Sequence, residues 1–119
     1  MSFQPQNAVV WSEIHVRNLD AAADFYGQVI GMDPARMEMF GAPVAIFGCM
    51  NGAGFDLQEG EPGNGSVVYI AAEGALAATM DRVRAAGGEV LSDAFEIPSG
   101  AFFKAKDPDG NVVGFFENA

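Results

Sequence analysis

Residues 8–31, "AVVWSEIHVRNLDAAADFYGQVIG", predict a strand followed directly by a helix. Side chains alternate between the two faces of a strand, so Trp11, Glu13 and His15 share one face of residues 8–17. The opposite face is apolar and is expected to pack in a core. The face with Trp11 is mixed, as the wall of a ligand cleft is.

The helix that follows is amphipathic. Asn18 or Asp20 can cap its start, and Gly31 ends it. We interpret Phe25 and Tyr26 as core residues, because aromatics at helical spacing pack in a core more often than they stack on a ligand. The predicted apolar stripe consists of Leu19, Ala23, Tyr26 and Ile30.

The same order of elements recurs along the chain. Three strands are predicted after the first helix, and a polar, glycine-rich connector over residues 59–65 precedes a second set. The stripe of the second helix starts at Leu76, 57 residues after Leu19, which indicates duplication of a βαβββ unit. The predicted strands are 36–40, 43–48, 54–58, 66–72, 89–97, 101–106 and 111–117; the second helix is 74–88, with Leu76, Met80 and Val83 as its stripe.

Size and composition favour one α+β domain over residues 1–119, with modules at about 8–58 and 66–117. No apolar run approaches the roughly 20 residues that span a bilayer. The formal net charge of −10 excludes nucleic acid and anionic membranes as partners. The single Cys49 is interpreted as a small buried residue, and a cytoplasmic location is expected.

The stretch "DPDGN" before the last strand is a turn signal. Pro108 suits the second position of a type I turn, Asp107 can bond back to the backbone, and Gly110 can take a positive φ.

Three stretches together resemble the vicinal oxygen chelate superfamily, which includes glyoxalase I, bleomycin resistance proteins and extradiol dioxygenases. They are "EIHVRNLDAAADFYGQVIGM" (13–32), "VVYIAAEGALAATMDRVRAAGGEVL" (67–91) and "KAKDPDGNVVGFFE" (104–117). The resemblance implies two βαβββ modules whose curved mixed sheets enclose a cleft, and it implies a homodimer. It does not fix the activity, because this fold hosts lyases, isomerases, dioxygenases and non-catalytic binders.

Metalloenzymes of this superfamily place ligands at four symmetric points. By the resemblance, three of these points fall on Trp11, Val67 and Gly114, and the fourth on Asp56 or Gln58. At least three points therefore hold residues that cannot bind a metal, and we expect neither a metal nor another cofactor. The alternative is a metal-dependent lyase, isomerase or dioxygenase with atypical ligands, namely Glu13, His15 and Asp56.

The leading interpretation is a protein that binds a small, partly aromatic or hydrophobic molecule without a metal. Glu13 and Lys104 are predicted to be its polar groups, and Gly114 to leave room for the ligand. The aromatics can instead fill the sheet themselves. Glu13 is the one weak candidate for a catalytic base. The expected ligand-binding residues are Trp11, Glu13, His15, Val67, Tyr69, Phe102, Lys104, Gly114 and Phe116.

Overall fold

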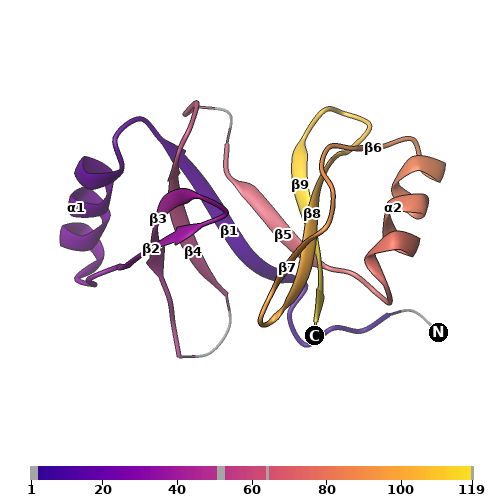
Figure 1. Cartoon of the computed structure of the whole chain (residues 1–119), viewed down its shortest axis with the longest axis horizontal. Helices are drawn as coiled ribbons and strands as arrows, with labels where there is room; N and C mark the ends of the chain where they lie inside the picture. The colour runs from indigo at the N-terminus through magenta and orange to yellow at the C-terminus, as the bar shows by residue number, and fades with distance from the viewer. Residues whose placement is uncertain (1–2, 51–52, 64, 119) are drawn as a thin grey trace. The chain divides into compact units, whose positions relative to one another are not determined.

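The computed structural model describes residues 3–50, 53–63 and 65–118 and has the predicted α+β architecture. Two units are distinguished within it (Figure 1). We call residues 11–66 the N-unit. The C-unit consists of the chain from Val67 onward, joined by the first ten residues. The amide of Ala71 donates to the carbonyl of Ala8 at 2.8 Å, which ties that first segment to the C-unit.

The N-unit is a four-stranded sheet with one helix on one face. Strand β1 runs parallel to β4, and β4 and β2 each run antiparallel to β3, which gives the order β2-β3-β4-β1. The elements are β1 (Val9–Val16), α1 (Leu19–Ile30), β2 (Ala35–Met39), β3 (Ala42–Phe47) and β4 (Gly54–Glu59).

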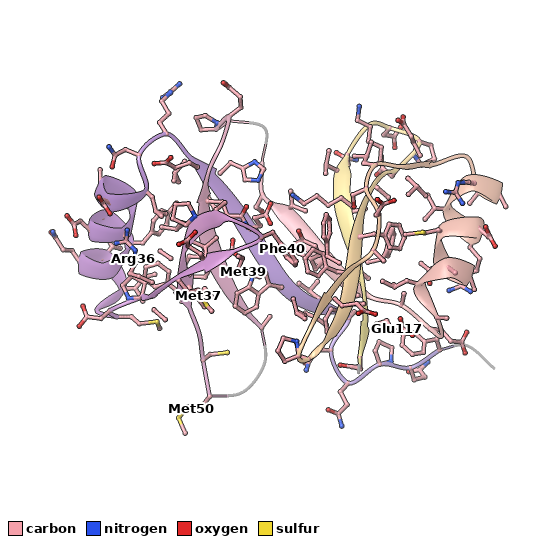
Figure 2. The ribbon with its side chains drawn as sticks, in the orientation of Figure 1. Arg36, Met37, Met39, Phe40, Met50 and Glu117 are labelled. Carbon is pink, nitrogen blue, oxygen red and sulfur yellow. The ribbon has the colours of Figure 1, made fainter. Side chains whose placement is uncertain are left out.

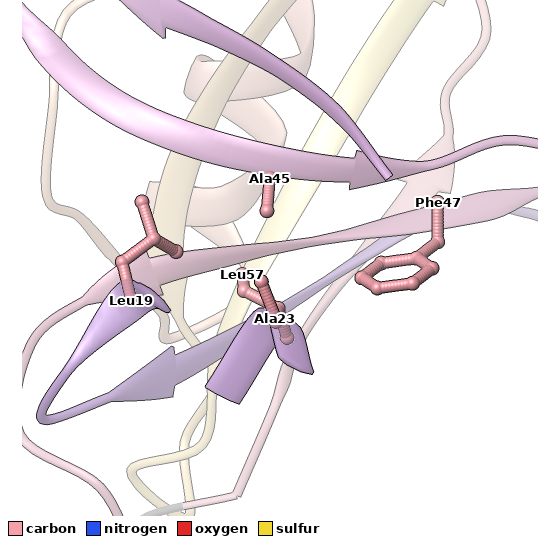
Figure 3. Close-up of a cluster of buried hydrophobic side chains, with 5 residues drawn as sticks. All are labelled: Leu19, Ala23, Ala45, Phe47 and Leu57. Atoms are coloured by element: carbon pink, nitrogen blue, oxygen red, sulfur yellow. The ribbon is translucent and has the colours of Figure 1, made fainter. Parts of the chain in front are cut away.

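The core of the N-unit lies between α1 and the sheet (Figure 3). It forms because every second residue of β3 and β4 faces the helix. The half-buried Ile14 and Val16 pack against it, which confirms the predicted apolar face of β1. Its buried members are Leu19, Ala23, Ala45, Phe47 and Leu57.

Helix α1 begins and ends as its sequence predicts. The Asn18 side chain accepts a hydrogen bond from the amide of Ala21 at 2.9 Å, and Gly31 ends the helix with a φ of 82°. Phe25 was expected in the core, and this is wrong: it is 60% exposed. Phe25 precedes Tyr26 and so points about 100° away from the helix stripe.

The far end of the stripe differs from expectation as well. Ile30, the last residue of α1, is exposed, whereas Tyr26 packs edge-on against Phe47 and Phe55 of the core. Cys49 is also exposed rather than buried. It lies after the end of β3, where the alternation that buries Phe47 no longer applies.

A tight hairpin joins β2 to β3. Met39 pairs with Ala42, so Phe40 and Gly41 form a two-residue turn. Both have positive φ values, 51° and 82°, which is the type I′ geometry that matches strand twist. The turn holds Phe40 exposed beside the methionines of β2; Met37, Met39 and Phe40 are labelled in Figure 2.

The C-unit repeats this connectivity. Strand β5 runs parallel to β9, and β9 is antiparallel to β8, as β1, β4 and β3 are arranged in the N-unit. The duplication of a βαβββ unit is therefore confirmed. The elements are β5 (Val67–Ala71), α2 (Leu76–Ala85), β6 (Glu89–Val90), β7 (Phe95–Ile97), β8 (Gly100–Lys106) and β9 (Val112–Asn118).

The single strand predicted over residues 89–97 is in fact two short strands, which both pair with β8. The break follows from Ser92. Its hydroxyl accepts the hydrogen bond from the amide of Lys104 at 3.0 Å, in the place of a backbone carbonyl, so the regular ladder stops there.

The core of the C-unit and its final turn agree with the sequence. Leu76, Phe103 and Ala105 are buried, and Met80 and Val83 of α2 pack against them. In the turn, the amide of Gly110 donates to the carbonyl of Asp107 at 3.0 Å. None of the helices in the described part of the chain is long and apolar enough to cross a membrane.

Candidate functional site

The candidate site of the N-unit lies on the sheet face opposite α1. Glu13 of β1 is in register with Asp56 of β4, and His15 is in register with Gln58. Their neighbours Ile14 and Leu57 point the other way, toward the α1 core. The alternation predicted for β1 is thus confirmed, and the parallel pairing with β4 brings a second set of polar side chains beside it.

These side chains form one hydrogen-bonded network, which we call the β1–β4 network: Trp11, Glu13, His15, Asp56 and Gln58. Glu13 Oε1 lies 2.8 Å from His15 Nε2, and Glu13 Oε2 accepts a bond from Gln58 Nε2 at 2.9 Å. The same Gln58 nitrogen lies 3.4 Å from Asp56 Oδ1. The indole nitrogen of Trp11 donates to Asp56 Oδ2 at 3.1 Å.

Two carboxylates are buried in this network. Glu13 is 4% exposed and Asp56 is 3% exposed, and Gln58 donates to both. A buried carboxylate is costly unless donors satisfy its oxygens, and the amide, indole and imidazole supply them here. The side chain of His15 is 29% exposed and Trp11 is half-buried, so these two aromatic groups connect the carboxylates to the surface.

Two glycines let the rings lie against the backbone, and the sequence analysis did not find them. A Cβ at Gly54 would lie 3.0 Å from Trp11 Cζ3, and one at Gly60 would lie 3.2 Å from His15 Cγ. The only available signal was a glycine at the start of β4 and another just after its end, which often marks a close approach of another group.

The register also decides between the two alternatives for the fourth symmetric point. Tyr69 pairs with Gly114 across β5 and β9, as Glu13 pairs with Asp56 across β1 and β4. Since Glu13 and Tyr69 are separated by 56 residues, as Trp11 and Val67 are, Asp56 is the counterpart of Gly114. With this register, the fourth point that the resemblance implies falls on Asp56 rather than Gln58.

In the C-unit the corresponding face is aromatic. Gly114 was expected to leave room for a ligand, but the ring of Tyr69 fills that room: a Cβ at Gly114 would lie 2.1 Å from Tyr69 Cδ1. Tyr69 is 5% exposed and meets Phe102 edge-on, with ring centroids 5.3 Å apart. Phe95 of β7 also packs against Phe102, with ring centroids 5.6 Å apart.

The remaining predicted residues of the C-unit differ in exposure. Val67 is buried, Phe116 and Lys104 are half-buried, and Lys106 is exposed beside the turn as expected. Lys104 lies on the strand face opposite the buried Phe103, the same face as Phe102. The nine predicted residues are thus three from the N-unit and six from the C-unit, and a cleft that joins the two sets stays a prediction.

Three of the four symmetric points that the resemblance implies hold residues that do not fit a metal ion. An indole, an alkyl group and a glycine offer no metal-binding atom at Trp11, Val67 and Gly114. Glu13 and His15 hydrogen-bond to each other instead of converging on a common point. Across residues 3–50, 53–63 and 65–118, no group of three or more His, Cys, Asp or Glu side chains is placed to hold a metal.

Duplicated βαβββ units, together with the α1 caps and the turn before β9, indicate the protein family of this chain. Residues 8–115 match the model of the Glyoxalase/Bleomycin resistance protein/Dioxygenase superfamily, and the chain belongs to this superfamily.

Two curated relatives and several solved structures are similar to the chain. The putative glyoxylases CFP32 of Mycobacterium bovis and Mycobacterium tuberculosis are each 30% identical over 121 residues, which is 93% of this chain and 44% of theirs. The chain thus spans less than half the length of these relatives.

The solved structures show the fold. Methylmalonyl-CoA epimerase from Mycobacterium tuberculosis superposes with a TM-score of 0.70 at 18% identity, covering 94% of this chain and 88% of that one. A Streptomyces coelicolor methylmalonyl-CoA epimerase in complex with 2-nitronate-propionyl-CoA gives 0.67 at 18% identity, covering 94% and 97%.

Proposed function

We propose that the chain binds a small, flat aromatic or hydrophobic molecule on the β1–β4 network and that binding needs no metal. The observation that carries the proposal is the buried pair Glu13 and Asp56, held by neutral donors behind two partly exposed aromatic groups. Membership of a superfamily that includes non-catalytic binders agrees with this proposal.

The β1–β4 network presents the indole ring of Trp11 to the ligand. Because the Trp11 N–H already donates to Asp56, the indole is fixed and presents its π face, which suits an aromatic or cationic partner. His15 lies on the same face of β1, and its side chain is 29% exposed. A few fixed polar groups beside an aromatic surface are a usual feature of small-molecule sites.

The carboxylates supply the polar part of recognition. One oxygen of Glu13 lies 2.8 Å from His15 Nε2, and the other accepts a hydrogen bond from Gln58 at 2.9 Å. We infer that a ligand N–H or O–H hydrogen-bonds to Glu13. In this proposal Glu13 anchors the ligand, and no reaction is assigned to it.

Tryptophan fluorescence tests the proposal directly, because Trp11 is the only tryptophan. A screen of flat aromatic compounds in the presence of a chelator is expected to find ligands that quench or shift its emission saturably. Glu13→Gln should weaken the best ligand by about tenfold or more, as expected for loss of a charged hydrogen-bond acceptor. Glu38→Gln, on the exposed part of β2, is the matched control and should leave binding unchanged.

The opposite results are equally clear. Emission that no compound changes, together with a Trp11 that a neutral quencher cannot reach, would show that the indole fills the sheet and forms no ligand wall. Equal weakening by Glu13→Gln and Glu38→Gln would show that the carboxylate network is not the anchor.

A further inference from the structure

A pocket of about 380 Å³ lies in the C-unit on the α2 side of its sheet, away from the face of Tyr69 and Phe102. It opens between α2, the end of β5 and the turn after β8. Val83, Val113 and Phe115 give it apolar walls, and Arg82 and Lys106 line it as well. We call it the α2 pocket. Its volume lies within the usual range for small-molecule sites, about 300–1,000 Å³.

One cation of the α2 pocket is held in place by neutral groups. Arg82 Nη2 donates to the carbonyl oxygen of Glu73 and to Thr79 Oγ1, each at 2.9 Å. Thr79 itself is buried, and its hydroxyl also lies 3.4 Å from the carbonyl oxygen of Ala75. These bonds fix the guanidinium but do not neutralise it, and they leave its Nη1 and Nε donors for another acceptor.

The charge of the α2 pocket is unusual for this chain. The sequence has six lysines and arginines against sixteen acidic residues, yet two of the six cations line this one pocket. Within the described residues, neither Arg82 nor Lys106 forms an ion pair with a carboxylate. Unpaired cations in a strongly acidic protein create a local positive potential where an anion is favoured.

The acidic residues of the α2 pocket limit that potential. Asp107 lines the pocket, but its carboxylate accepts bonds from the amides of Asp109 and Asn111 and from the Asn111 side chain. Glu73 also lines the pocket. Because two carboxylates lie beside the two cations, a polyanion is disfavoured in this pocket.

We propose that the α2 pocket binds a small organic monoanion, with its carboxylate toward Arg82 and Lys106 and its apolar body against Val83, Val113 and Phe115. An arginine with free donors recognises a planar carboxylate by paired hydrogen bonds, and the apolar walls favour an alkyl or aryl tail over a bare anion. This site is independent of the β1–β4 network.

The test is an NMR titration of the intact chain with hexanoate and, separately, with its neutral isostere hexanamide. Hexanoate should shift the amide signals of residues 79–88 and 106–115 saturably. Hexanamide should bind at least about tenfold more weakly, because it lacks the charge that pairs with Arg82. The emission of Trp11 in the N-unit should stay constant, which separates this site from the proposed β1–β4 site.

Three variants locate the binding. Arg82→Gln should weaken hexanoate by about tenfold, as for a hydrogen bond to a charged group. Lys106→Gln should weaken it by about two- to fivefold, as for an exposed ion pair, and removes an exposed side chain, so the fold is retained. Arg84→Gln is the matched control: Arg84 lies on the same helix but pairs with Asp81 and does not line the pocket.

Equal affinities for hexanoate and hexanamide would overturn the proposal, because the cations would then contribute nothing. A non-saturable titration, or a loss with Arg84→Gln as large as with Arg82→Gln, would overturn it as well, since either indicates general attraction of anions to the helix surface.

Discussion

Single residues decide how much space each sheet face leaves, and Gly114 shows this most clearly. The absent Cβ does not open a cavity in the C-unit; it admits the buried ring of Tyr69. A glycine in a strand therefore indicates a close approach, but the sequence does not tell which group approaches. In the N-unit the equivalent position is Asp56, which holds a polar network instead.

Gly114→Ala tests this packing. The new Cβ would lie 2.1 Å from Tyr69 Cδ1, so the buried ring must move. We expect the free energy of unfolding, measured with urea, to fall by about 1–3 kcal/mol, as in other overpacked cores. In a Tyr69→Ala background the same substitution should cost much less.

Gly48→Ala is the matched control, because nothing lies within 4 Å of its added Cβ. It should change the free energy of unfolding by less than about 0.5 kcal/mol. If Gly114→Ala is as neutral as this control, the space above Gly114 is open and the ring of Tyr69 does not fill it.

Among the helices, strands and turns, the features that depend on local contacts were predicted correctly more often than those that depend on tertiary packing. Asn18, Gly31 and the "DPDGN" turn act through their own backbone neighbours, so the sequence located them correctly. The break after β6 depends on the Ser92 hydroxyl meeting the amide of Lys104, twelve residues away. A contact of that kind leaves no periodic signal.

The residues of the candidate site likewise include some that local sequence predicts and some that it does not. Alternation along β1 placed Trp11, Glu13 and His15 on one face, because a strand has a fixed period of two. The contribution of Gln58 could not be derived from local sequence, since it depends on the register between β1 and β4. Phe25 was misplaced because helical spacing identifies a stripe but does not show where its edge lies.

The turn of Asp107 gives a pH-dependent prediction. Hydrogen bonds from the side chain and the amide of Asn111 hold the pKa of Asp107 below its ordinary value of 3.8. A carboxyl group whose pKa is lower in the folded state stabilises the fold above its unfolded pKa, and this contribution is lost as the pH falls through the folded pKa. The gap in free energy of unfolding between wild type and Asp107→Asn should therefore be larger at neutral pH than in acid.

Urea unfolding of both proteins across the acidic range measures that gap. In an Asn111→Ala background the gap should depend less on pH, since the donor with the largest effect on the Asp107 pKa is gone. A gap between wild type and Asp107→Asn that is constant from neutral to acidic pH would show that the turn does not favour the ionised form.

For the whole molecule, duplication supplies two similar units whose equivalent positions have diverged. Glu13 and Asp56 of the N-unit correspond to Tyr69 and Gly114 of the C-unit, so one sheet face is polar and the other aromatic. Metalloenzymes of this superfamily take their metal ligands from both modules. Here the oxygen and imidazole groups of the network all come from one unit and bond to one another.

Thermal melting in the presence and absence of metals shows whether the folded chain binds a metal ion. A metal that binds only the folded state raises its stability by mass action. The melting curves of the chelator-treated protein, alone and after addition of Mn²⁺, Ni²⁺, Zn²⁺ or Co²⁺, are therefore predicted to coincide. A saturable rise in Tm at a stoichiometric concentration of one ion, abolished by Glu13→Gln or Asp56→Asn, would contradict the account and identify the β1–β4 network as a metal site.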